Sequence, residues 1–568
     1  MSTRKNLAVV ALAVAEMAAW TSLPAAGAPS AGQSACVAGG ACYDSLAEAL
    51  AASEAGDTVR LSAGTFAGGV TIDHSLRLVG TGAARTTIEG GGPVITVTST
   101  KAHRPTVLIS RLTVTGGVSH GDGVNAYGGG IFVPPVEVEG DVEPGASLTI
   151  DRVTVTRNRT APTTTMDSPS GVKCPESDCP YAGSYGGGIG SFGDLTIRRS
   201  RITANIAGGR ASDAFGGGVY SELGNVRVAQ SKVSGNRAYP AEMGIGRFAE
   251  GGGLFVHSGT LRVTGSHVDR NRADLVTGWP VEAHGEPIDM NAHAGGIHAG
   301  AHVPTVVSNS TVNHNVARAI DPAGQPLAFD AGMLAHLSRL TMRNSEVSYN
   351  KIIVDAATTE DVAPVGSALE VNQASTITGS KIVGNSVRVN SDHGVAVASS
   401  GLAVYDFTET GNPGLVVVRD TKISGNTAVA TSETGSASVV GAGLFNNTLL
   451  RVYDSQIRDN QGTASAPHAS TQGGGVWNGV FLSGPPVELT LVRSTVTGNA
   501  LTVTSSGERQ GGGIYNSETW NSGRPGSPRT GQTSASAADR LTPVARVVTA
   551  AVGTVRLSTR DVGRVVRR

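Results

Sequence analysis

The chain is poor in aromatic residues, in charge and in long apolar runs. Only 4% of its 568 residues are Phe, Trp or Tyr, and 16% are charged. The apolar stretch near the N-terminus is too short to cross a bilayer as a helix, and no other run is long and apolar enough. The formal net charge of −1 argues against nucleic acid as the main partner. Glycine, in contrast, is abundant with 77 residues, which favours a fold with many tight turns.

The N-terminus has the layout of a secretory signal peptide. Arg4 and Lys5 precede the apolar run Leu7–Ala15, and small residues follow up to Ala28. We therefore predict a signal peptide over residues 1–28 and a secreted, extracellular protein, in solution or associated with a cell wall. No transmembrane segment is expected once the signal peptide is removed.

Cysteine is scarce, with four residues in two local pairs, Cys36 with Cys42 and Cys174 with Cys179. An even number of cysteines after a secretory signal predicts disulfides. The alternative for the second pair is a metal site, which would need ligands from elsewhere in the chain. We expect two disulfides and no metal.

A repeated unit fills the middle of the chain. The stretch Gly186–Ala207 reads GGGIGSFGDLTIRRSRITANIA, and Gly216–Ala238 and Gly251–Ala273 repeat its design. Self-similarity of this kind indicates a repeat architecture. The last Asn of the unit recurs at intervals of 31 to 47 residues. The series is Asn158, Asn205, Asn236, Asn271, Asn315, Asn350, Asn385, Asn426, Asn460 and Asn499.

Each unit offers three short runs of alternating apolar and β-branched residues, which is typical of strands. Stacked three-strand coils with strands about 4.8 Å apart form a right-handed parallel β-helix. We therefore predict an all-β solenoid of about a dozen coils over residues 29–517. The repeated Asn side chains are expected to point inward and to hydrogen-bond in a ladder at a sharp turn.

The two ends of the solenoid differ from its middle. The Ala-rich stretch Tyr43–Ala55 predicts a short helix with Asp44 or Ser45 as N-cap, covering the first coil. Residues 518–568 contain nine Arg, no Lys and three acids. This composition predicts a basic tail without regular structure that contacts anionic wall polymers.

With its GGGI and SGN/RDN signals, the chain resembles right-handed parallel β-helix proteins of the pectate-lyase-like superfamily. Its repeats are similar to the GGA[ILV] and FxxN repeats of polymorphic outer-membrane proteins. The resemblance covers roughly residues 43–517 and concerns the fold. That fold serves lyases, esterases, adhesins and phage tailspikes, so the resemblance implies no single activity.

The residue after the apolar residue of each GGGI-like motif should point outward. Six of these residues are aromatic, although aromatics are rare in the chain. An outward row of rings could stack on sugars, and the alternative is that the segments after the Asn residues cover the rings. The six rings are Phe132, Tyr220, Phe255, Phe445, Trp477 and Tyr515.

A polar window lies between two groups of these rings. His298 and Glu370 take the outward position, and His257 and His336 follow two residues after it in their coils. Because adjacent coils are about 4.8 Å apart, the four side chains could converge on one bound group. His with Glu could share acid–base work or bind a metal, so these residues are the candidate catalytic residues. Exposed His residues on a strand are the alternative.

Other catalytic templates find little support. The chain contains neither Asp-Asp nor Gly-His-Gly, the pairs that a polygalacturonase-like site would need. A calcium-dependent lyase needs several carboxylates on one face, and the outward positions supply only Glu222 and Glu370. Calcium is therefore expected only if the protein is a lyase.

We expect a secreted, monomeric β-helix module that binds a polysaccharide or a cell or wall surface through its sheet face and inter-coil loops. Two alternatives remain open at this point. One is a polysaccharide lyase or glycoside hydrolase, and the other is a purely structural stalk or adhesin. Whether the protein is an enzyme is uncertain, with the sequence favouring a non-catalytic role.

Overall fold

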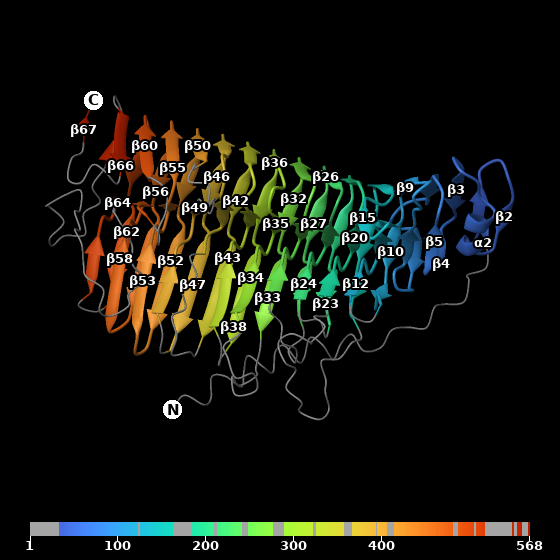
Figure 1. Ribbon diagram of the computed structural model, residues 1–568, viewed down its shortest axis with the longest axis horizontal. Helices are drawn as coiled ribbons and strands as arrows, with labels where there is room; N and C mark the ends of the chain where they lie inside the picture. Colours follow the sequence, from blue (N-terminus) through green and yellow to red (C-terminus); the bar gives the residue numbers. More distant parts are fainter. Residues whose placement is uncertain are drawn as a thin grey trace.

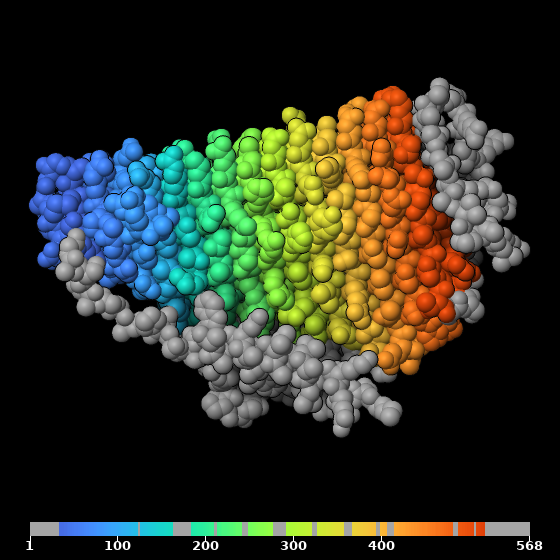
Figure 2. Space-filling model, turned by 180° about the vertical axis from the view of Figure 1, so that it is seen from behind, coloured from blue at the N-terminus to red at the C-terminus, as the bar shows by residue number. Residues whose placement is uncertain are grey.

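The computed structural model shows an elongated stack of strands that runs from the blue N-terminal end to the red C-terminal end (Figure 1). Successive coils also follow one another in sequence order on the opposite side (Figure 2). The predicted signal peptide lies outside the described residues. The structure describes residues 33–122, 125–162, 183–209, 213–240, 248–276, 289–321, 325–356, 366–392, 395–405, 414–480, 487–504, 507–516, 548–549, 554–558 and 566–567.

One turn of the chain carries five strands in the middle of the stack, not the three predicted. The two additional strands come from the segment after the repeated Asn, which was expected to be a loop. The strands of one such coil are β20 (Ile189–Ser191), β21 (Leu195–Arg198), β22 (Arg201–Thr203), β23 (Ile206–Gly208) and β24 (Asp213–Phe215).

Each strand pairs in parallel with the corresponding strand of the next coil. Ile189 lies opposite Val219, Leu195 opposite Val226, and Ile202 opposite Val233. The predicted parallel β-helix is therefore confirmed. We number its sheets 1 to 5 after the strands β20 to β24 that they contain. Further along the chain, a four-stranded sheet takes the place of sheet 5; its strands are β48 (Val395–Ala398), β53 (Ser436–Val440), β58 (His468–Gln472) and β63 (Glu508–Gln510).

Two separate apolar interiors hold the coils. Inward residues of sheets 1 to 3, such as Ile189, Leu195 and Ile202, form the main core. A second interior lies between sheet 4 and sheet 5 and is rich in alanine, for example Ala273 of β33 (Arg272–Val276) and Ala292 of β34 (Asp289–His293). The small methyl side chains let these two sheets pack closely as a double layer beside the main core.

The predicted Asn ladder is present between sheets 3 and 4. From Asn158 to Asn499 each Nδ2 donates to Oδ1 of the next Asn over 2.8 to 3.0 Å, and all ten side chains are buried. The residue before each Asn has a positive φ, from Arg157 to Gly498. A second ladder, not predicted, joins backbone N–H groups to hydroxyls from Ser200 to Ser494 at the corner between sheets 2 and 3.

The N-terminal end carries the helix α2 (Leu46–Ala51), shorter than the predicted Tyr43–Ala55. Ser45 is its N-cap and forms a capping box with Glu48. The helix buries Leu46 and Leu50 in the main core. No helix in the described part of the chain has the length and apolarity that a membrane span requires.

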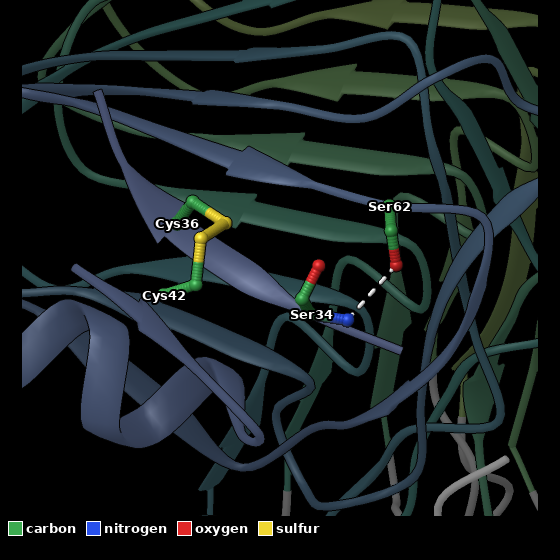
Figure 3. The surroundings of a disulfide bond; sticks show 4 residues. All are labelled: Ser34, Cys36, Cys42 and Ser62. Carbon is green, nitrogen blue, oxygen red and sulfur yellow. Dashed lines mark hydrogen bonds between the residues drawn. A yellow bond between two sulfur atoms is a disulfide. The ribbon is translucent and has the colours of Figure 1, made fainter. Parts of the chain in front are cut away.

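Beside the helix, strands β1 (Ala35–Val37) and β2 (Cys42–Tyr43) pair antiparallel and are joined by a disulfide between Cys36 and Cys42. The backbone N–H of Ser34 donates to Ser62 Oγ next to this disulfide (Figure 3). The first of the two predicted disulfides is therefore confirmed.

The second predicted disulfide is not among the bonds that the structure shows. Cys174 and Cys179 both lie between residues 162 and 183, outside the described residues. The expectation that Cys174 and Cys179 pair with one another therefore stays a prediction. Non-reducing peptide mapping of the protein would test it, because the two residues are only five positions apart in the sequence and a bond between them closes within one short peptide.

Three short strands are described in the basic tail. Strand β66 (Thr554–Ser558) pairs antiparallel with β60 (Glu488–Val492) of sheet 2, and β65 (Val548–Thr549) pairs with β61 (Thr495–Thr497) of sheet 3. Strand β67 (Val566–Arg567) pairs with β66. Most of the tail lies outside the described residues.

Candidate functional site

The six predicted stacking rings do not form an exposed surface. Five are buried, with Tyr220, Phe255 and Tyr515 between 2% and 5% exposed and Phe445 and Trp477 at 0%. Only Phe132 is half-buried. The expectation of an open row of rings is therefore wrong, and the alternative that the segments after the Asn residues cover the rings describes the structure.

The cover is a second aromatic column on sheet 5. Tyr127, Tyr185 and Phe215 lie in register on adjacent strands, with ring centroids 4.7 and 5.4 Å apart. Tyr185 meets Tyr220 of sheet 1 edge to face at 5.0 Å. Because rings of the two sheets pack on one another, no ring face of Tyr220 remains for a sugar.

His298 lies at the same covered position, on β35 (Ile297–Ala299), and is 7% exposed. Its Nδ1 lies 2.9 Å from Oε2 of Glu250, the last residue of β29 (Phe248–Glu250) on sheet 5. Phe255 meets His298 edge to face at 4.6 Å, and His293 lies at 6.1 Å.

The other predicted catalytic residues converge only in part. The ring of His336 lies 6.4 Å from that of His298. His257 is exposed, and its Nδ1 lies 3.5 Å from Oε1 of Glu222. Glu370 is two coils beyond His298 in the register of sheet 1 and has a different partner, Asp330.

Asp330 and Glu370 form a buried carboxyl pair. Asp330 is 1% and Glu370 5% exposed, and their side chains share a hydrogen bond. Ser367 Oγ donates to Asp330 Oδ1 over 2.9 Å, and Asn372 Nδ2 donates to Glu370 Oε1 over 2.8 Å. Asp330 has a φ of 55° at a turn where other coils place glycine, for example Gly216. A carboxyl in such a backbone conformation is held there by its surroundings.

Burial sets the protonation of these acids. It raises the pKa of Asp330 well above its usual range, and the nearby charge of Glu370 raises it further. Burial also raises the pKa of Glu370 to about 7, against the lowering effect of the hydrogen bond from Asn372. The raised pKa of Asp330 favours its protonated form, which can donate to Glu370.

The ionisable groups around His298 have lowered pKa values, in contrast to Asp330 and Glu370. Burial alone would raise the pKa of Glu250, but the adjacent His298 lowers it below its usual range. Burial lowers the pKa of His293 to about 4 and also lowers that of His336. Of this group, Glu250 is therefore charged and His293 neutral at pH 7.

We expect the imidazole of His293 to stay neutral down to about pH 4. The physical reason is that charging a buried ring costs more free energy than Glu250 returns. Ring ¹⁵N shifts measured between pH 3 and pH 8 would test this, with the exposed ring of His257 as the internal comparison. A His293 midpoint near 6.5 would contradict the expectation.

Sequence reasoning missed Glu250, His293 and Asp330. A signal for the first two exists, because Tyr185, Phe215, Glu250 and His293 each come immediately before a triplet of small residues. That position faces the outward residue of the GGGI-like motif once sheet 5 folds over sheet 1. No group of three or more His, Cys, Asp or Glu in the described ranges could hold a metal ion.

A shallow groove of about 290 Å³ lies on the outer face of sheet 3. It is lined by residues of β27 (Lys232–Ser234), β32 (His267–Asp269) and β37 (Thr311–Asn313) and of the turns that follow. Asp269 is buried in its wall, with Oδ2 accepting from Arg270 over 2.7 Å and lying 3.4 Å from Lys232 Nζ. The lining residues are Lys232, His267, Asp269, Arg270, Thr311, Asn313 and His314.

Sheet 2, which precedes sheet 3 in every coil, presents exposed arginines. Arg227 and Arg262 lie in register on adjacent strands, β26 (Asn225–Ala229) and β31 (Thr260–Thr264). Neither makes an ion pair with another described residue, whereas Arg198 contacts Asp151 and Arg419 contacts Asp454. The exposed arginines on the strands of this face from β21 onward are Arg198, Arg227, Arg262, Arg343, Arg419 and Arg451.

Comparison with known proteins adds little to this picture. No protein-family model and no curated protein matches the sequence. Among solved structures, the chain is similar to a mannuronic acid specific polysaccharide family 6 lyase from human gut microbiota. The identity is 10%, the TM-score is 0.23, and the match covers 83% of this chain and 82% of the other. At these values the similarity supports no inference about activity, and the fold rests on the parallel register of the strands.

Proposed function

We propose that the protein is a secreted, non-catalytic β-helix module that binds acidic polysaccharide along the outer face of sheets 2 and 3. The observation that supports this most directly is the row of exposed arginines on sheet 2. Arg227 and Arg262 lie in register on adjacent coils, which are about 4.8 Å apart, and the other exposed arginines follow on further coils, so an extended polyanion can contact several of them at once.

Sheet 3 continues the basic surface around the corner of the coil. Arg201 lies in register with Lys232, and Lys381 with Lys422. An anionic polymer across the coils would therefore meet positive side chains on both sheets. Carboxylates of a uronate polymer fit the fork of donors that an arginine offers. The predicted binding through a sheet face thus moves from sheet 1 to sheets 2 and 3.

The enzyme alternative has weaker support. Its candidate residues His298 and Glu370 are buried and contact other side chains of the protein, whereas a catalytic group must reach the substrate. A structural stalk would need no face with a run of exposed arginines. Export is supported by the disulfide between Cys36 and Cys42, because disulfides persist in oxidising compartments. We propose a monomer that needs no cofactor.

The test is retention of the purified protein on polygalacturonate, measured by affinity electrophoresis at several salt concentrations. We expect the double variant Arg227→Gln/Arg262→Gln to bind at least tenfold more weakly, because two contacts with anionic groups are lost. Its binding should also depend less on salt, since fewer charges are screened.

The matched control is Lys351→Gln/Arg388→Gln, which removes two exposed positive charges from sheet 4 on β43 (Lys351–Ala356) and β47 (Ser386–Ser391). It should bind as the parent protein does. No retention on any acidic polysaccharide, or tighter binding to DNA than to polygalacturonate, would contradict the proposal. Release of unsaturated ends would favour the lyase alternative.

A further inference from the structure

Sheet 4 carries a cluster of three arginines around one buried carboxylate, that of Asp274, whose side chain is 0% exposed. Its Oδ2 lies 2.7 Å from Nε of Arg237 and 3.0 Å from Nε of Arg272, and its Oδ1 lies 3.1 Å from Nε of Arg318. Arg237 lies in register with Arg272, and Asp274 with Arg318. The strands that carry the cluster are consecutive in sheet 4: β28 (Arg237–Tyr239), β33 and β38 (Val316–Asp321).

The charges of this cluster do not balance. Three guanidinium groups face one carboxylate, so two positive charges are in excess, and no other described carboxylate pairs with these arginines. A carboxylate has about four acceptor positions and each guanidinium has five N–H donors, so Asp274 cannot satisfy all three groups. By comparison, Asp151 and Asp454 each contact two arginines. Because the three cations repel one another, a further anion would stabilise their arrangement.

The outer nitrogens of the cluster are available to such an anion. Arg237 and Arg318 each donate from Nε to Asp274, and their terminal nitrogens donate to no other described residue. In the described part of the chain, these terminal nitrogens are also not among the buried polar atoms that lack a partner. The side chains of Arg237, Arg272 and Arg318 are 24%, 41% and 21% exposed, so solvent reaches them.

The arginines are also held in place before any ligand binds. Asp274 contacts Nε of each one, which leaves the terminal nitrogens on the far side of each guanidinium group. The guanidinium of Arg237 lies 3.8 Å from the ring centroid of Tyr239, a cation–π contact that fixes its plane. A site whose donors are already ordered loses less side-chain entropy when it binds.

We propose that Arg237, Arg272 and Arg318 form a binding site for a doubly charged tetrahedral oxyanion, either free phosphate or a phosphate group at the end of a larger molecule. A phosphate group carries a charge of about −1.5 to −2 at neutral pH, which matches the excess charge of the cluster. Its oxygens accept the paired N–H donors that a guanidinium fork presents. Asp274 positions the arginines and does not contact the ligand.

This site goes beyond the proposed function, because it lies on sheet 4 and its ligand is a compact dianion, whereas the polysaccharide is assigned to sheets 2 and 3. The test titrates the full chain in a calorimeter with inorganic phosphate, with glucose 6-phosphate and with acetate, at low ionic strength. Inorganic phosphate should bind about tenfold more weakly to Arg237→Gln and to Arg318→Gln, since each change removes a charged pair of donors. Acetate, which is planar and singly charged, should bind the parent about tenfold more weakly than phosphate.

The matched control is Arg388→Gln, which removes an exposed arginine of sheet 4 that does not contact Asp274. It should bind phosphate as the parent does. Glucose 6-phosphate that binds at least as tightly as inorganic phosphate would identify a phosphate group on a larger molecule as the ligand, and weaker binding would identify the free ion. Failure of both to bind the parent, or unchanged affinity in both Arg237→Gln and Arg318→Gln, would overturn the site.

Thermal unfolding separates this site from a purely structural ion cluster. Phosphate should raise the midpoint of unfolding of the parent and of Asp274→Asn, where three guanidinium groups remain without their carboxylate. It should raise the midpoint of Arg237→Gln/Arg318→Gln much less, and circular dichroism checks that each variant is folded. A structural cluster would lose stability in all of these variants with the same response to phosphate, and that result would contradict the proposal.

Discussion

Replacing Asn315 by leucine should lower the free energy of unfolding by about 4 kcal/mol, the largest effect that we expect of a single substitution. Asn315 Oδ1 accepts from both the backbone N–H and Nδ2 of Asn271, each over 3.0 Å. Its own Nδ2 donates to Val268 O and to Asn350 Oδ1, each over 3.0 Å. Leucine has a similar volume but removes these four buried hydrogen bonds. Asn271 Nδ2 keeps its bond to Val233 O and Asn350 Oδ1 keeps the backbone N–H of residue 315, so the main cost comes from the other two groups, at roughly 1 to 3 kcal/mol each.

Urea denaturation followed by circular dichroism would measure this loss. Asn225→Ala is the matched control, because Asn225 is exposed on sheet 2 and its Nδ2 donates to Asp194. That change should cost less than about 0.5 kcal/mol. Equal stability of the two variants would show that the ladder does not hold the coil. Since each coil contacts only its neighbours, we also expect hydrogen exchange to rise first next to Asn315.

The second large effect is a loss of stability as the pH rises through neutrality. The folded pKa of Glu370 is about 7, above its ordinary value of 4.5. A raised pKa means that the folded state binds more protons than the unfolded state between these values. The contribution of Glu370 to the free energy of unfolding is therefore fully present below about pH 4.5 and is lost as the pH rises through 7. The loss amounts to roughly 3 kcal/mol by pH 8.

Urea titrations at intervals from pH 5 to pH 8 would follow this change. Asp330→Asn should make the free energy of unfolding depend less on pH, because one of the two buried acids is removed. The amide can still donate to Glu370, and asparagine tolerates a positive φ. Glu370→Gln should remove the part of the dependence that comes from Glu370 and leave the part that burial of Asp330 causes. The control is Glu346→Gln, which alters a partly exposed partner of Lys381. A parent profile that rises between pH 5 and pH 8 would refute the assignment.

The sequence predicted those parts of the fold that repeat in both spacing and chemistry. The GGGI-like motifs and the ladder Asn residues recur in the coils from Asn158 to Asn499, and each Asn repeats a contact with its own copy in the next coil. The strands of sheets 4 and 5 were not predicted, because their inward residues are mostly alanine and alanine has little strand preference. Segments of variable length also separate them, for example between Val276 and Asp289.

The candidate site was predicted less well, for a related reason. Alternation along a strand correctly placed Phe255, His298 and Glu370 on the side away from the main core. It could not show that another sheet covers that side. The partners Glu250 and Asp330 belong to this cover, and they are distant from His298 and Glu370 in sequence. The groove escaped notice because its residues repeat no motif and meet only when three coils stack.

Because of the Asn ladder, the conformation of the turn does not depend on which residue occupies it. The residue before each ladder Asn has a positive φ whether it is Arg157, Ala204, His314, Tyr349 or Asp459. Since the interior bonds hold the bend, the side chain that projects from it is free to change. The turns before the ladder Asn residues therefore form a row of evenly spaced surface positions whose side chains can change. A new binding specificity can arise there by substitution without any change in the interior.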